Sequence, residues 1–163
     1  MTAPDPASVA PFVPNDFEPP RRLEHPSFVL VPLGPEHNAS DYAAWTSSLD
    51  HIHATPGYAD YPWPHPMTLD ENLGDLVRHA QDFADRTGFT YTVLAPDGAD
   101  GDAPTVIGCV YIYPTTDTEH DVRVQSWVRA ADAELDAELH AAVSAWLASD
   151  WPFTRVEYAD RPA

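Results

Sequence analysis

Val122-Arg123-Val124-Gln125-Ser126-Trp127-Val128 is a β-branched and apolar run that predicts a strand, and Ala131-Asp132-Ala133-Glu134-Leu135-Asp136 follows it where a helix should begin. The expected helix runs to about residue 148 and buries one apolar face, formed by Leu135, Leu139, Val143, Trp146 and Leu147. A helix start presents unpaired N–H groups and the positive end of the helix dipole, so it binds phosphate when small residues let a ligand approach. Here three carboxylates occupy the junction. We expect Asp132 to cap the helix, and Glu134 and Asp136 to offset its dipole.

Two further helices are expected upstream of this junction. Gly34-Pro35 ends a strand that begins at Phe28, and a short helix follows to about Ser48. A second helix begins after Thr68, because Thr68 and Glu71 have the spacing of a capping box. Its apolar residues recur every three or four positions, at Leu73, Leu76, Val77, Ala80, Phe83 and Ala84. Asp82 and Arg86 are expected to pair on the opposite face, and Gly88 to end the helix.

The remaining strands are predicted at 89–95, 105–114 and 153–158. Polar turns join 89–95, 105–114 and 121–128 into an antiparallel meander, and the helix between 121–128 and 153–158 makes the last pairing parallel. The predicted order is βααβββαβ, in a single domain over residues 27–163. Seven prolines precede it, so residues 1–26 are expected to be an extended or disordered arm, part of which can lie across the domain.

The charge of the chain is strongly acidic. It has 163 residues, of which 26 are Asp or Glu and 8 are Arg, with no Lys, giving a formal net charge of −18. Nucleic acid and anionic membranes are therefore poor partners, whereas amines would be attracted. A genome rich in G and C or adaptation to salt would produce the same composition. Cys109 is alone and no segment has the length of a signal peptide or membrane span, so we expect a cytoplasmic protein without a disulfide.

The predicted order, together with Val106-Ile107-Gly108 at the start of the strand at 105–114, resembles the GNAT superfamily of acyl-CoA-dependent N-acetyltransferases. The resemblance implies an α+β, three-layer GNAT-like acyl-CoA N-acyltransferase fold with a mixed, mostly antiparallel sheet. It also implies acetyl-CoA or another acyl-CoA as cofactor, and direct attack of a small neutral amine on the thioester. By this resemblance, we expect the C-terminal half to be shortened relative to the family.

The family holds the cofactor pyrophosphate with a loop of pattern Q/R-x-x-G-x-G/A. In this chain Ala131, Glu134 and Asp136 stand at its three key positions. The resemblance assigns any cofactor contacts to the end of the strand and to this loop, which are Val128, Ala131, Asp132, Ala133, Glu134, Leu135 and Asp136. The alternative is a non-catalytic module that has lost acyl-CoA binding and instead binds a small molecule or forms a homodimer.

Candidate substrate-binding residues lie in the Pro-rich aromatic segment and on the central strand. They are His51, His53, Tyr58, Tyr61, Trp63, Tyr111 and Tyr113. His51 and His53 would share one side of an extended segment, and strand alternation would place Ile107 and Cys109 on the same face as the two later tyrosines. Packing of these aromatic residues is the competing interpretation. Glu119 and His120 are the candidate catalytic bases, and no metal is expected, because H-x-H alone is a weak metal signature.

Overall fold

The structure is a computed structural model, and it describes residues 11–96 and 104–162. A six-stranded sheet runs in the order β1 (Leu23–His25), β2 (Phe28–Pro32), β3 (Phe89–Leu94), β4 (Val106–Tyr113), β5 (Val122–Val128) and β6 (Val156–Tyr158). The first five strands pair antiparallel and β6 pairs parallel to β5, as expected for a strand that returns through a helix.

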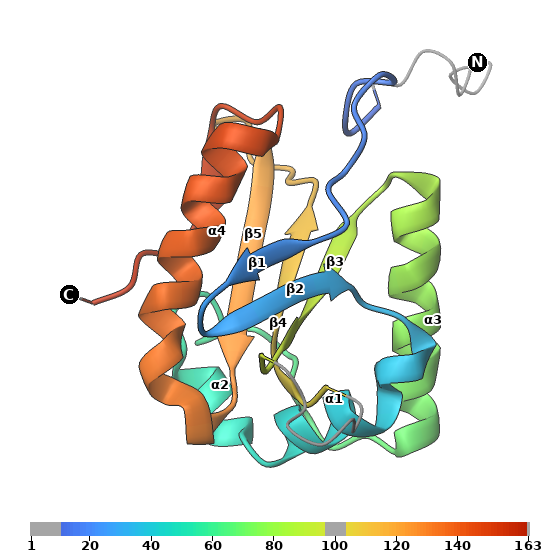
Figure 1. The fold of residues 1–163 in the computed structure, drawn as a ribbon, viewed down its shortest axis with the longest axis vertical. Helices are drawn as coiled ribbons and strands as arrows, with labels where there is room; N and C mark the ends of the chain where they lie inside the picture. The colour runs from blue at the N-terminus through green and yellow to red at the C-terminus, as the bar shows by residue number, and fades with distance from the viewer. Residues whose placement is uncertain (1–10, 97–103, 163) are drawn as a thin grey trace.

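Helices cover both faces of this sheet (Figure 1). On one face lies α4 (Asp136–Asp150), whose Leu139, Val143, Trp146 and Leu147 are buried as predicted. On the other face lie α1 (Asn38–Thr46), α2 (Leu49–Ala54) and α3 (Leu69–Asp85). Two short 3-10 helices, η2 (Pro35–His37) and η3 (Ala130–Leu135), precede α1 and α4. The predicted elements are therefore present, with β1 and α2 in addition.

The segment before β2 is part of the packed structure from residue 11 onward. Val13 is 1% exposed and belongs to the core on the α4 side, and β1 lies within the segment predicted as an arm. Arg86 fixes this segment by donating to the backbone oxygens of Pro14 and Phe17, both at 2.7 Å. The sequence did not predict β1 because three residues are too few for an alternation to be recognised. Residues 1–10 lie outside the described residues.

The two ends of α3 show one prediction confirmed and two that are wrong. The capping box is present, with Glu71 N–H donating to Thr68 Oγ1 at 3.1 Å and Thr68 N–H donating to Glu71 Oε1 at 2.9 Å. However, the helix ends at Arg86, which adopts the left-handed conformation with φ 63°, and not at Gly88. The expected Asp82–Arg86 pair does not form, because Arg86 binds the N-terminal segment and Asp82 accepts from Tyr113.

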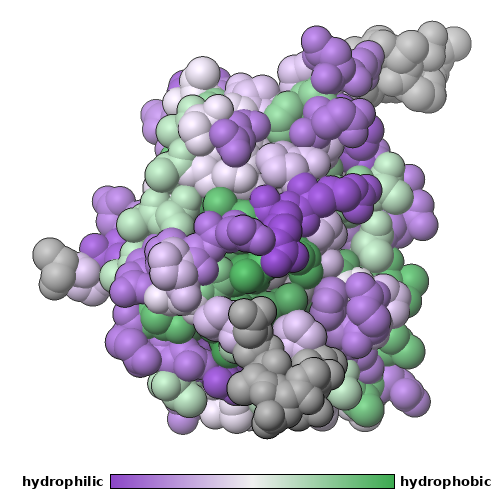
Figure 2. All heavy atoms as spheres, in the orientation of Figure 1, coloured by the Kyte–Doolittle hydropathy of each residue, from purple (hydrophilic) through white to green (hydrophobic). Residues whose placement is uncertain are grey.

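The apolar face predicted for α3 is split between the core and the solvent. Leu76 and Phe83 are buried, but Leu73 and Val77 are exposed, as is Leu69. The helix is rotated in this way because polar residues of α3 face a cavity above the sheet. Figure 2 shows hydrophobic colouring along α3, at the right of the view, and hydrophilic residues over β1, whereas the colouring over α4 is mixed. Within the described residues, no helix combines the length and the apolar character needed to cross a bilayer.

Candidate functional site

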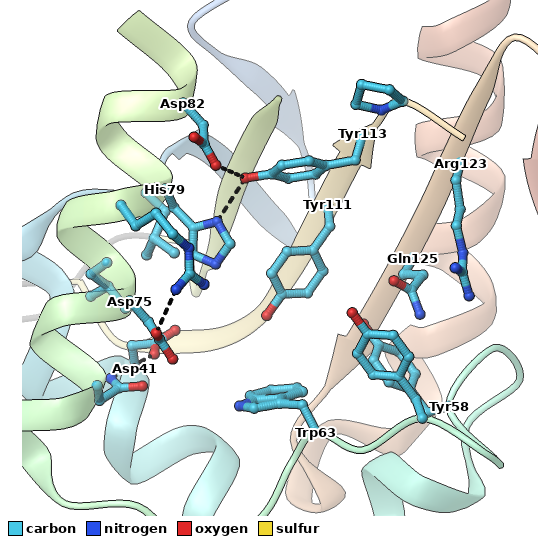
Figure 3. A pocket seen from close by; sticks show the side chains of 16 residues that line it. Asp41, Tyr58, Trp63, Asp75, His79, Asp82, Tyr111, Tyr113, Arg123 and Gln125 are labelled. Carbon is cyan, nitrogen blue, oxygen red and sulfur yellow. Dashed lines mark hydrogen bonds and ion pairs between the residues drawn. The ribbon is translucent and has the colours of Figure 1, made fainter. Parts of the chain in front are cut away.

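A cavity of about 410 Å³ lies on the face of the sheet that α1, α2 and α3 cover. Strands β4 and β5 form its floor, α3 forms one wall, and the Pro-rich segment after α2 forms the opposite wall (Figure 3). Its aromatic lining consists of Tyr58, Tyr61, Trp63, Tyr111 and Tyr113. The polar lining includes Asp41, Asn72, Asp75, Arg78, His79, Asp82, Arg123 and Gln125. One side of the cavity is thus aromatic and the other is rich in carboxylates.

The aromatic wall is held in place by hydrogen bonds at both ends of the Pro-rich segment. The ring Nε2 of His53 lies 2.6 Å from the backbone oxygen of Pro64, and Gln125 donates to the backbone oxygen of Gly57 at 3.1 Å. Trp63 packs against Trp45 and Trp127, with ring centroids 5.5 and 6.0 Å apart. These contacts give a proline-rich segment without helix or strand a defined position over the sheet.

Two phenols of the cavity are neutral hydrogen-bonding groups. Burial raises the pKa of both Tyr58 and Tyr111 well above the usual range for a phenol. The Tyr111 hydroxyl accepts from Trp127 Nε1 at 3.1 Å, which leaves its own hydrogen for another acceptor. The Tyr58 hydroxyl is buried and has no hydrogen-bond partner among residues 11–96 and 104–162. A buried polar atom without a partner is costly, so Tyr58 presents an unused donor and acceptor beside the cavity.

Asp41 supplies a buried carboxylate. It is 4% exposed, and its Oδ2 accepts from the side chain of Asn72 at 3.1 Å. Asn72 is oriented in turn by Trp45, whose Nε1 donates to Asn72 Oδ1 at 3.0 Å. Removal from water raises the pKa of Asp41 to about 6. No ion pair joins Asp41 to an Arg or His in the described part of the chain, so its charge at neutral pH is uncompensated.

A polar stripe of α3 forms the wall next to Asp41. Asp75, His79 and Asp82 share it because they are four and three residues apart. Asp75 pairs with Arg78 at 3.0 Å, and Asp82 accepts from the Tyr113 hydroxyl at 2.8 Å. The Nδ1 atom of His79 lies 2.8 Å from the same hydroxyl (Figure 3). Burial lowers the pKa of His79 to about 4, so its imidazole is neutral at physiological pH.

Five of the seven predicted substrate-binding residues line this cavity, namely the four tyrosines and one tryptophan of its aromatic lining. His51 and His53 do not line it. The predicted extended segment is wrong, because both lie on α2, where residues two apart point in roughly opposite directions. Ile107 also departs from its predicted face. A register shift opposite Val93 and Leu94 turns Ile107 into the core on the α4 side, whereas Cys109 and Tyr111 face the cavity side.

The predicted bases Glu119 and His120 lie elsewhere, on the turn between β4 and β5. Neither lines the cavity, and the Nδ1 of His120 lies 2.6 Å from a carboxylate oxygen of Asp117. One ligand atom each of Asp117, His120 and Glu157 lies within 4.8 Å of the others, a set that could hold a metal ion. Asp117 is exposed and the other two residues are half-buried, and His120 is already in contact with Asp117, so the arrangement is equally that of a hydrogen-bonded turn near the surface.

The start of α4 differs from the prediction in how its carboxylates are used. Its N-cap residue is Leu135, and Asp132 does not cap the helix but pairs with Arg129 at 2.6 Å. Asp136 pairs with Arg161 at 2.6 Å, and the side chain of Arg161 is only 4% exposed. The guanidinium also donates to the backbone oxygens of Ala159 and Ser126, at 2.9 Å each. The junction therefore carries arginine–carboxylate pairs.

These residues do not fit the diphosphate of an acyl-CoA. A phosphate site at a helix start needs free N–H groups and a close approach to the backbone, which glycine permits. Here Ala131 replaces the Gln or Arg of the family pattern, and Glu134 and Asp136 replace its two glycines. Glu134 is exposed at the junction, and Asp136 lies on the first turn of α4. Two cations lie at the junction, but Arg129 is already paired with Asp132, and Arg161 is already bound to Asp136 and to β5. The predicted cofactor-binding residues, from Val128 to Asp136, lie at the junction of β5 and α4, and their side chains are unsuited to a diphosphate.

The sequence did not reveal the polar half of the cavity. Asp75, His79 and Asp82 form a recognisable helical stripe, but a polar stripe normally faces water. Asp41 gave no signal at all, since one carboxylate in a short helix is ordinary. Arg123 and Gln125 alternate with the apolar residues of β5, which is the pattern of any strand with one open face.

Comparison with solved structures identifies the fold. A putative ribosomal-protein-serine acetyltransferase from Vibrio cholerae superimposes with a TM-score of 0.64 at 12% identity, covering 86% of this chain and 74% of the other. A putative GNAT-family acetyltransferase from Bordetella pertussis gives 0.53 at 15% identity, covering 84% and 76%. The microcin self-immunity acetyltransferase MccE, solved in complex with acetyl-CoA and AMP, gives 0.54 at 9% identity, covering 76% and 62%.

At these identities the similarity concerns the fold. The chain has the GNAT acyl-CoA N-acyltransferase fold, with a mixed six-stranded sheet and flanking helices, as the sequence predicted. No family model matches the sequence, and no curated protein matches it.

Proposed function

We propose that this protein binds a small organic amine in the cavity between α3, the aromatic segment and the sheet, without using acyl-CoA. The observation that carries the proposal is Asp41, a buried carboxylate that lines an aromatic cavity and has no cationic partner among the described residues. A buried charge is stable only when it is paired, and an organic cation would supply the missing charge.

The aromatic wall suits the same ligand. Trp63 and the neutral phenols of Tyr58 and Tyr111 offer apolar area and negative ring faces to a cation. The net charge of −18 raises the local concentration of amines around the protein at low salt. A cavity of about 410 Å³ has the size of an ordinary small-molecule site.

Calorimetric titration with 2-phenylethylamine tests this proposal, with 2-phenylethanol as a neutral ligand of the same shape. The amine is expected to bind and the alcohol to bind at least about tenfold more weakly, because only the amine compensates Asp41. Asp41→Asn should remove the difference between them, whereas Asp60→Asn, which changes an exposed loop carboxylate, should keep it. Equal affinity of the two ligands for the unaltered protein would contradict the proposal.

A second candidate function is acyl transfer to that amine. It is favoured by the fold, since the structural neighbours are described as acetyltransferases and one was solved with acetyl-CoA. The arginine–carboxylate pairs at the start of α4 favour the first function. Titration of acetyl-CoA at moderate salt separates the two, because salt screens the repulsion by the acidic surface. Saturable micromolar binding would contradict a function without acyl-CoA and favour the second candidate, and formation of the N-acetylated amine from acetyl-CoA would then establish it.

A further inference from the structure

His79 occupies a position in the cavity wall where its protonation pattern is fixed by its neighbours. The Tyr113 hydroxyl donates its hydrogen to the Asp82 carboxylate at 2.8 Å. The Tyr113 oxygen then has only lone pairs to offer to His79 Nδ1, which is also 2.8 Å away. The hydrogen in that short contact must come from Nδ1. Thr90, with its Oγ1 3.0 Å from Nδ1 and 3.4 Å from the Tyr113 oxygen, can donate to the tyrosine and stabilise the same arrangement.

The other ring nitrogen of His79 is consequently a hydrogen-bond acceptor. A neutral imidazole with its hydrogen on Nδ1 carries a lone pair on Nε2. This atom makes no hydrogen bond with the described residues, and His79 lines the cavity beside Tyr111, with ring centroids 5.6 Å apart. The chain from Asp82 through Tyr113 to His79 thus ends at an unused acceptor on the carboxylate-rich side of the cavity (Figure 3).

We propose that His79 Nε2 and the Asp41 carboxylate accept two N–H hydrogens of one ligand ammonium group, so that the cavity selects primary and secondary ammonium ions over quaternary ones. This inference rests on the proposed function and specifies its ligand class. An aromatic cage alone would act in the opposite sense, because its attraction to a cation does not require N–H groups and it accommodates methylated ammonium groups well. The selectivity of the cavity therefore shows whether hydrogen bonds to the two acceptors or contacts with the aromatic rings contribute more to ligand binding.

A methylation series on one carbon skeleton measures this selectivity. The probes are 2-phenylethylamine and its N-methyl, N,N-dimethyl and N,N,N-trimethyl derivatives, titrated calorimetrically into the full chain at pH 7.5. The primary amine is expected to bind about tenfold or more tightly than the trimethyl ion, since the latter leaves two buried acceptors unpaired. Equal or tighter binding of the trimethyl ion would overturn the inference and leave the proposed function standing. Absence of binding by all four would overturn both.

Variants assign the selectivity to His79. His79→Leu should reduce the ratio between the primary and trimethyl ions toward one, mainly by weakening the primary amine. His65→Leu changes an exposed histidine outside the cavity and should leave the ratio unchanged. A preserved ratio in His79→Leu would contradict the role of Nε2.

The hydrogen position can be measured without any substitution. Long-range ¹H–¹⁵N spectra of the unaltered protein should show His79 Nδ1 bearing the hydrogen and Nε2 free of it. Tyr113→Phe removes the acceptor of the Nδ1 hydrogen, so it should shift the ring toward a mixture of both forms while leaving Nε2 itself in place. A hydrogen on Nε2 in the unaltered, ligand-free protein would overturn the inference directly.

Discussion

The guanidinium of Arg161 lies 2.6 Å from the carboxylate of Asp136 and is almost completely buried between the first turn of α4 and the end of β5. The resemblance to the GNAT superfamily implies that cofactor phosphates would bind at the start of this helix. In this chain the start of α4 carries an internal ion pair whose cation comes from the segment after β6. The positive end of the helix is thus occupied by a side chain of the protein.

Arg161→Leu is expected to destabilise the protein by about 3 kcal/mol, because it leaves the largely buried carboxylate of Asp136 without a partner. Urea denaturation monitored by tryptophan fluorescence measures the loss. The double variant Arg161→Leu/Asp136→Leu should recover much of the lost stability, because two apolar side chains then replace the ion pair. Arg22→Leu is the matched control, because the Arg22–Glu24 pair is exposed and should matter little. A loss no larger in Arg161→Leu than in Arg22→Leu would show that the pair is not structural.

Val13→Ala tests whether the N-terminal segment is part of the cooperative core. Val13 is 1% exposed, and loss of two buried methyl groups costs about 2 kcal/mol. Asn15→Ala, an exposed change two residues further on, should have little effect. If both variants unfold at the same urea concentration as the unaltered protein, the segment is not packed on the core.

The sequence predicts the sheet and its helices because their signals are local. The Thr68–Glu71 capping box and the spacing of Leu139, Val143 and Trp146 each lie within one element, and each was confirmed. The end of α3 was misplaced because Arg86 is tied to a segment about 70 residues earlier, a contact that no local pattern contains. The same contact leaves Asp82 free for Tyr113.

The aromatic half of the site could be predicted from the sequence because its signal is local, whereas the polar half could not. The aromatic residues Tyr58, Tyr61 and Trp63 are conspicuous among prolines, so composition alone indicates a wall. Asp41 and His79 are ordinary residues until packing buries them, and burial is what changes their pKa values. Such groups become recognisable only when the tertiary structure is known.

Gly108→Ala is expected to destabilise the protein by about 2–3 kcal/mol, because a Cβ at this position would overlap the backbone oxygen of Trp127 on β5. A backbone atom in a paired strand cannot move aside without breaking the ladder. Gly74→Ala provides a contrast within the same protein, since a Cβ there meets nothing within 4 Å on the exposed side of α3. It should stabilise by about 0.5–1 kcal/mol through helix propensity. Similar effects of the two substitutions would contradict the close approach of β4 and β5.

Asp41→Asn should stabilise the protein at neutral pH by about 2–3 kcal/mol while weakening amine binding. The pKa of Asp41 is raised from 3.8 to about 6. Between pH 3.8 and pH 6, Asp41 is therefore protonated in the folded state and ionised in the unfolded state. The contribution of Asp41 to stability is therefore fully present below pH 3.8 and is lost as the pH rises through 6. The gain in Asp41→Asn should be near zero at pH 4 and constant above pH 7. A constant gain at every pH would assign the effect to packing instead of charge.

Amine affinity is expected to fall as the pH decreases through 6, because the protonated Asp41 carboxyl no longer compensates a cation. The groups that face Asp41 are Asn72 and Asp75 from α3 and Cys109 and Tyr111 from β4. His79 has a pKa of about 4 and stays mostly neutral in this range, so it adds little to the change. Between pH 7.5 and pH 5 the affinity for 2-phenylethylamine should decrease about tenfold, since only about a tenth of Asp41 remains ionised at pH 5. Affinity for 2-phenylethanol should not decrease, and Asp41→Asn should abolish the pH dependence for the amine. An affinity for the amine that is constant over this range would show that Asp41 does not bind the ammonium group.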